Sequence, residues 1–153
     1  MFALRLNAVR RPPTNVAKSP TGCRELRVAD DVGSTAVIVE LLQGHYPLAL
    51  QLAEKDTDPE AREMALAIVY SALGKPEDSK QALERLLRVP MSEYSVAAVH
   101  AYQGEKDVAF RSLEAAYQQH RPDLLGLKTD PLLTRLRTDE RYKGLLRRMN
   151  LPE

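Results

Sequence analysis

The side chains best suited to acid–base or metal chemistry are scattered along this chain. The three histidines, His45, His100 and His120, lie far apart, and none belongs to the two-histidine helical spacing that binds zinc. The single cysteine, Cys23, can form neither an internal disulfide nor a paired thiolate site. We therefore predict no metal site, and we interpret His100 as a hydrogen-bonded packing residue rather than a catalytic base.

Acidic pairs and glycines do not complete a catalytic or nucleotide-binding motif. Asp30-Asp31, Glu77-Asp78 and Asp139-Glu140 are neighbours in sequence, so they diverge around a helix or occupy its first turn. The chain has no Gly-x-Ser-x-Gly nucleophile elbow and no Gly-x-Gly-x-x-Gly fingerprint, and Gly74-Lys75 lacks the context of a phosphate loop. These observations favour a protein that is not an enzyme and that binds no cofactor.

A repeat of thirty residues indicates how the chain is organised. Gly44, Gly74 and Gly104 each follow an apolar helix-like run and precede a polar, alanine-containing run. A period of this size is typical of stacked structural units. Asp58 is suited to cap a helix that ends at Gly74, and Pro76 opens the next helix. Because one unit cannot bury its apolar faces alone, the sequence predicts an all-α fold, an α-solenoid of about three antiparallel helix pairs.

The boundaries follow from the same pattern. The helical repeat domain is expected over residues 30–153, with units at about 34–56, 59–88 and 91–119 and a helical cap at 123–150. Residues 1–29 are expected to be a basic, mobile arm, because residues 1–24 carry five bases and no acid. Such a leader is also typical of organelle-targeting peptides. No apolar run approaches the ~20 residues that span a bilayer, so we expect a soluble, cytoplasmic protein.

The units resemble the tetratricopeptide repeat (TPR) family, in which small residues stand where the two helices of a unit cross. The matching positions hold Ala67 with Ser79, Ala97 with Ala109 and, less closely, Val37 with Ala49. The period of thirty is shorter than the thirty-four usual in that family, and the chain has no tryptophan. The resemblance implies a protein-interaction module.

The closing segment, residues 127–152, resembles the tail of TPR arrays in bacterial signalling and regulatory proteins. Asp130 is expected to cap one short helix and Thr138 another. The last helix should bury a single apolar stripe made of Tyr142, Leu145, Leu146 and Met149. Its basic residues should form the polar outside that a terminal layer needs, and they are Arg135, Arg137, Arg141, Lys143, Arg147 and Arg148.

A partner-binding groove is predicted on the concave face, which the first helix of each unit lines. Its candidate residues are Met64, Ile68, Met91, Tyr94, Ala98 and Tyr102. Ile38 and Leu41 share this face, and we interpret them, together with Ile68, as packing between layers. An apolar groove of this kind suits an amphipathic helix or an extended apolar segment. Some TPR domains bind acidic tails through Lys, Asn and Arg, which these positions lack.

Three functional hypotheses follow. The leading one is a non-enzymatic scaffold that binds a protein or peptide partner, or a second copy of itself, through the apolar groove. A second is a nucleic-acid-binding accessory protein that uses the basic arm together with Arg147 and Arg148, although a net charge of +1 makes nucleic acid a less favoured partner. A third, implied by the resemblance, is an adaptor or a fragment of a multidomain bacterial regulator.

Overall fold

The computed structural model describes residues 28–152, and these residues form helices and connecting turns. The elements are α1 (Val28–Leu42), α2 (Tyr46–Lys55), α3 (Pro59–Ala72), α4 (Pro76–Leu86), α5 (Glu93–Gln103), α6 (Lys106–Gln118), the 3₁₀ segments η1 (Pro122–Gly126) and η2 (Pro131–Leu136), and α7 (Glu140–Arg148). No strand occurs within residues 28–152, so the predicted all-α class is confirmed. The predicted arm, 1–29, lies outside the described residues except for its last two, which begin α1.

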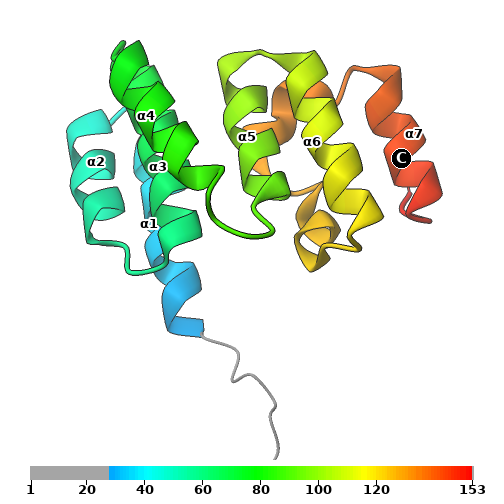
Figure 1. Cartoon of the computed structure of the whole chain (residues 1–153), viewed down its shortest axis with the longest axis horizontal. Coiled ribbons are helices and arrows are strands. Elements are labelled where there is room, and N and C mark those ends of the chain that lie inside the picture. The colour runs from blue at the N-terminus through cyan, green and yellow to red at the C-terminus, as the bar shows by residue number, and fades with distance from the viewer. Residues whose placement is uncertain (1–27, 153) are drawn as a thin grey trace, which may run out of the picture.

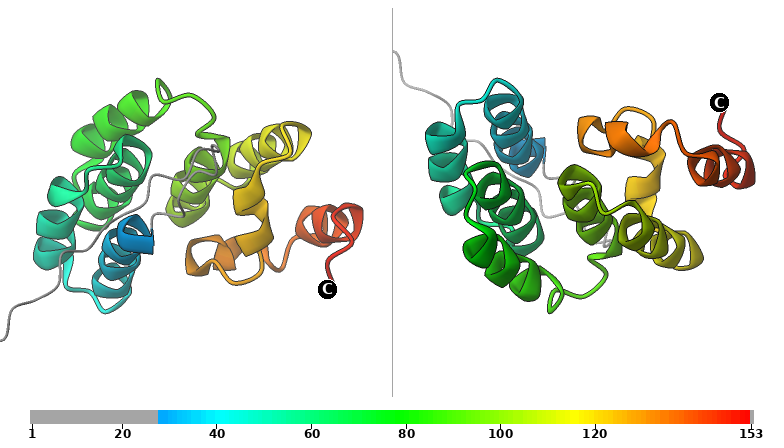
Figure 2. Two further views of the ribbon diagram at one scale, coloured as in Figure 1. Left: turned by 90° about the horizontal axis from the view of Figure 1, so that it is seen from below. Right: turned by 90° about the horizontal axis from the view of Figure 1, so that it is seen from above.

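Successive helices pack side by side along a curved row (Figure 1). Contacts join α1 to α2, α3 to α4, and α5 to α6, and α3 also contacts α1 and α5. Figure 2 shows α1, α3 and α5 on the inner side of the curve and α2, α4 and α6 on its outer side. The η2 segment packs against α5 on the inner side, and α7 lies at the far end beside α6. No helix among residues 28–152 combines the length and apolar character needed to cross a bilayer.

One turn geometry closes α1, α3 and α5. Gly44, Gly74 and Gly104 have φ values of +81°, +69° and +87°, in the left-handed region that glycine adopts without steric cost. The residue after each glycine donates its backbone N–H across the turn to a helix carbonyl, at 2.9 Å in all three cases. This is the Schellman arrangement, which satisfies the last carbonyls of a helix. The predicted cap at Gly74 is confirmed, and the same turn occurs at Gly44 and Gly104.

The predicted helix-capping residues are confirmed at Asp58 and Asp130 and wrong at Thr138. Asp58 Oδ1 accepts a hydrogen bond from the N–H of Ala61 at 2.9 Å, and Asp130 Oδ1 accepts one from the N–H of Leu132 at 2.8 Å. Thr138 does not cap α7. Asp139, the next residue, caps α7 instead. It has the extended backbone of a cap, and its Oδ1 accepts a hydrogen bond from the backbone N–H of Arg141 at 3.0 Å.

Small residues fill the contact between α3 and α4, as predicted for the positions where the two helices of a unit cross. Ser79 Oγ donates a 2.6 Å hydrogen bond to the carbonyl of Ala67, and both residues are buried. The other expected crossing residues, Ala97, Ala109, Val37 and Ala49, are buried as well. On α4 the buried residues are Ser79, Ala82 and Leu86. Leu87, the residue just after this helix, is 61% exposed.

Candidate protein-binding cleft

The structure separates the six residues that were predicted to line one apolar groove. Ile68 and Ala98 are 2% and 0% exposed, so they belong to the core and are inaccessible to a partner. Met91 is 52% exposed but lies in the connection between α4 and α5, where it lines a different cavity. Met64 and Tyr94 do line a common cleft on the inner side of the row.

Tyr102, the sixth predicted residue, lies near the end of α5 and outside that cleft. Its ring is partly buried, and the guanidinium carbon of Arg135 lies 5.8 Å from the ring centroid. Arg135 Nη1 also donates a 2.6 Å hydrogen bond to the backbone carbonyl of Tyr102. A cation at this place satisfies a carbonyl at the negative end of the helix, so Tyr102 belongs to the attachment of η2 to α5.

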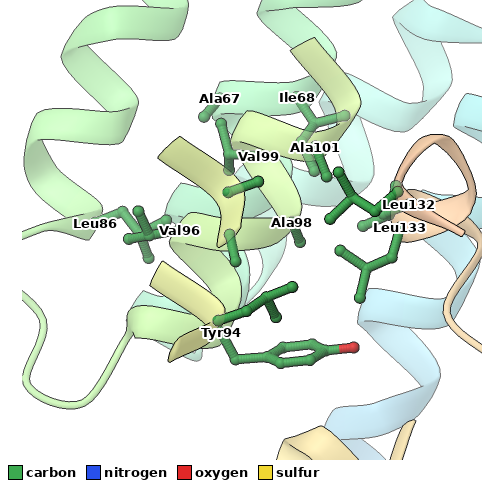
Figure 3. Close-up of a cluster of buried hydrophobic side chains, with 14 of the residues drawn as sticks. Ala67, Ile68, Leu86, Tyr94, Val96, Ala98, Val99, Ala101, Leu132 and Leu133 are labelled. Carbon is green, nitrogen blue, oxygen red and sulfur yellow. The ribbon is translucent and has the colours of Figure 1, made fainter. Parts of the chain in front are cut away.

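The closing segment explains why the predicted groove is not open along α5. Leu132 and Leu133 of η2 are buried, and Figure 3 shows both side chains in the same buried cluster as Ala98, Ala101 and Tyr94 of α5. The segment that was expected to cover the end of the stack thus folds back onto its inner face. Part of the concave surface is occupied by the chain itself.

The remaining cleft has a volume of about 770 Å³ and is bounded by α1, α3, α5 and the η1–η2 segment. Apolar side chains contribute one part of its lining, namely Ile38, Ala61, Met64 and Leu132. Carboxylates contribute another, namely Asp58, Glu60, Asp123 and Asp130. Among the described residues that line it, Arg121 is the one basic side chain. The cleft is therefore mixed and acidic, whereas the predicted groove was mainly apolar.

Glu60 is the centre of a polar cluster that joins three elements across the cleft. Its Oε1 accepts a 2.7 Å hydrogen bond from Ser95 Oγ on α5 and lies 3.4 Å from Arg121 Nη2. Arg121 also pairs with Asp123 at the start of η1. Burial raises the pKa of Glu60 above its usual value, while Ser95 and Arg121 act in the opposite direction. A further positive charge beside Glu60 would therefore be favourable.

Tyr94 and Asp130 form a second link, between α5 and η2. Tyr94 Oη donates a 2.8 Å hydrogen bond to Asp130 Oδ2, while Oδ1 of the same carboxylate caps η2. The tyrosine is only 8% exposed. Burial, and secondarily the charge of Asp130, raise the pKa of Tyr94 far above its usual value. The hydroxyl of Tyr94 therefore takes part in a structural hydrogen bond between α5 and η2.

The histidines lie outside the cleft. His100 Nδ1 is 2.6 Å from Glu105 Oε2, and the ring is partly buried, so its interpretation as a hydrogen-bonded packing residue is confirmed. His45 Nδ1 is 2.7 Å from Glu40 Oε2 across the equivalent turn. Among the side chains that the structure describes, residues 35–152, no group of three or more His, Cys, Asp or Glu residues is arranged to hold a metal ion.

The convergence of acidic groups depends on contacts between distant parts of the chain. Asp58 precedes α3, Asp130 precedes η2, and both are recognisable from sequence as helix caps. That these helix starts open onto one cleft depends on the inward fold of η2, for which local sequence carries no signal.

No protein-family model, curated protein or solved structure matches this chain.

Proposed function

We propose that this chain is a short TPR-like solenoid that acts as a non-enzymatic scaffold. Its units would be the three antiparallel pairs α1–α2, α3–α4 and α5–α6, closed by residues 122–150. The inner cleft between α1, α3, α5 and the η1–η2 segment would receive a segment of a partner protein. The observation that carries this proposal is the cleft itself, with a volume of about 770 Å³, an apolar part and four carboxylates.

The lining of the cleft defines what the partner segment should contain. Its apolar part, which includes Ile38 and Met64, favours burial of apolar side chains. Carboxylates such as Glu60 and Asp123 favour lysine or arginine, because opposite charges pair across protein interfaces. We therefore infer a partner segment in which basic residues alternate with apolar ones. The cytoplasm is the proposed compartment, since a lone cysteine suits reducing surroundings.

The nucleic-acid alternative is less well supported, because two arginines of α7 are engaged within the molecule. Arg141 pairs with Asp107 at 2.8 Å, and Arg148 pairs with Glu114 at 2.5 Å. A phosphate would have to replace these carboxylates before it could use either cation. The hypothesis of an adaptor or a fragment of a multidomain regulator stays a prediction, since no observation on the described residues bears on it.

Site-specific photo-crosslinking in cell extract tests the proposed site. A crosslinking amino acid at Thr35, an exposed residue of the cleft, should give discrete products with a partner. The same amino acid at Glu84, exposed on the outer side of α4, should not give those products. The substitution Met64→Arg, which fills the cleft and reverses its charge preference, should abolish them.

A matched control uses an exposed leucine elsewhere. Leu87→Arg makes a similar change in size and charge on the outer surface and should leave the products from position 35 unchanged. Circular dichroism should show the same helicity for both arginine variants. Identical products from positions 35 and 84, or products that survive Met64→Arg in the folded protein, would contradict the assignment of the cleft.

A further inference from the structure

We propose that the basic segment at the start of this chain, residues 2–11, occupies the inner cleft of the same molecule and competes there with the partner. This inference rests on the proposed function, because it concerns the regulation of that site. The segment lies outside the described residues, and its sequence complements the lining of the cleft. Charge, apolar character and reach each support it.

Charge is the first point of complementarity. Residues 2–11 include Arg5, Arg10 and Arg11 and contain no acidic residue. The described residues that line the cleft include four carboxylates and one cation, Arg121. Arginine pairs with carboxylates through two parallel N–H donors, so a segment with several arginines matches the carboxylates of the cleft in both charge and geometry.

Apolar side chains are the second point. Phe2, Leu4 and Leu6 alternate with Ala3 and Arg5 in the sequence. In an extended segment, alternate residues point to opposite sides, so these three large apolar side chains would share one side. The cleft offers a matching apolar lining from α1, α3 and η2, made of Ile38, Ala61, Met64 and Leu132. An extended segment could thus bury its apolar side while its arginines reach the carboxylates.

Reach does not limit this arrangement. The residues between Arg11 and Val28, where α1 begins, can extend to about 50 Å. The helical rise from Val28 to Ile38, which lines the cleft, is about 15 Å. A tethered segment meets its own cleft at an effective concentration on the order of millimolar. It would therefore compete with a partner segment even if its intrinsic affinity were weak.

Paramagnetic relaxation in the full-length protein tests the proposal. Because Cys23 is the only cysteine, the double substitution Cys23→Ser and Asn7→Cys allows one spin label at position 7. The label should broaden the amide signals of Thr35, Ser95 and Thr129, which line the cleft, and spare Glu84 on the outer side of α4. Salt at about 1 M should reduce the broadening, because it screens exposed charges beyond a few ångströms.

Charge reversal supplies the matched comparison. Substituting Arg5, Arg10 and Arg11 each by Glu should abolish the broadening of the cleft amides. Reversing two exposed cations of the outer surface, Lys80→Glu with Arg88→Glu, should leave it intact. Broadening that is absent from the cleft, spread evenly over the molecule, or insensitive to the three arginine substitutions would overturn the proposal.

Mixing experiments separate this inference from the other possible outcomes. Isotope-labelled protein without a spin label is mixed with spin-labelled protein without isotope. Cleft broadening that arises only in the mixture would mean that a second copy is the occupant, and it would overturn the intramolecular proposal. If the cleft is not broadened while position 35 still crosslinks a partner, the self-occupancy fails and the proposed function stands. If the cleft is broadened but position 35 never yields a partner, the proposed function fails instead.

Discussion

Arg141 of α7 lies over the ring of Phe110 of α6, with its guanidinium carbon 4.2 Å from the ring centroid. The same guanidinium donates a 2.8 Å hydrogen bond to Asp107, one turn before Phe110 on α6. Two turns further along both helices, Arg148 repeats the arrangement over the ring of Tyr117, at 4.7 Å, and pairs with Glu114. Each arginine thus contacts an aromatic ring and a carboxylate of α6, and the two pairs attach α7 to the rest of the molecule.

Loss of one of these attachments should weaken the docking of α7. We expect Arg148→Ala to lower the free energy of unfolding by about 1 kcal/mol, because an exposed cation–aromatic contact and an exposed ion pair each contribute a fraction of that amount. Urea unfolding followed by circular dichroism measures the change. Arg88→Ala, which removes an exposed arginine just after α4, is the control and should change stability by much less. Equal losses in the two variants would contradict the attachment.

The hydroxyl of Tyr94 should contribute to stability rather than to binding. Tyr94→Phe removes the donor to Asp130 without changing the shape of the ring, so we expect a loss of about 1.5 to 3 kcal/mol. Tyr102→Phe is the control, since that ring is partly exposed near the end of α5, and its stability should stay close to that of the original protein. If Tyr94→Phe is as stable as the control in urea, the hydrogen bond does not join α5 to η2.

The contact between α5 and α6 should not tolerate a larger side chain. Ala109 is fully buried, and Ala109→Leu should overpack the contact and cost about 1 to 3 kcal/mol. Ala115→Leu, placed on the same helix where the alanine is partly exposed, should be nearly neutral. Thermal unfolding of both variants distinguishes the positions. A melting temperature for Ala109→Leu at or above that of Ala115→Leu would place the crossing elsewhere.

Acid should release the start of α7 at an unusually low pH. Hydrogen bonds from Arg141 lower the pKa of Asp139 to about 2, from an ordinary value of 3.8. Because the folded-state pKa is the lower one, the stabilising contribution is complete above the ordinary value and is lost as the pH falls through about 2. NMR titration of the Asp139 carboxyl carbon measures the midpoint directly. In Arg141→Ala the midpoint should move up toward 3.8, and an unchanged midpoint would show that Arg141 is not the cause.

The sequence predicts the row of helices better than it predicts the site. At Gly44, Gly74 and Gly104 the backbone is left-handed, a conformation that favours glycine. The spacing of these glycines therefore predicts where the turns lie. The burial of Leu132 and Leu133 against α5 has no such local requirement. The same leucine pattern would serve equally well for a cap on the end of the row, and only the tertiary contacts decide between the two.

The mixed, acidic lining of the cleft depends on the packing of η2 against α5, which the local sequence does not determine. Asp58 and Asp130 are predictable as helix caps one at a time, yet they lie far apart in the sequence, and their approach depends on η2 folding inward. Glu60 and Arg121 likewise look like ordinary surface charges until α3 and η1 are brought together. An apolar groove was the natural expectation from the helices alone, because the charged groups reach it from the helix starts.

Titration of the cleft with a synthetic peptide of residues 2–11 tests most directly whether it binds basic, apolar segments. The protein is the full chain with Arg5, Arg10 and Arg11 each replaced by Glu, and amide chemical shifts are followed by NMR. We predict saturable shifts confined to the cleft, at Thr35, Ser95 and Thr129, that disappear with Met64→Arg and persist with Leu87→Arg. Shifts that are absent, or that fall mainly on α2, α4 and α6, would contradict the assignment of this cleft as the binding site.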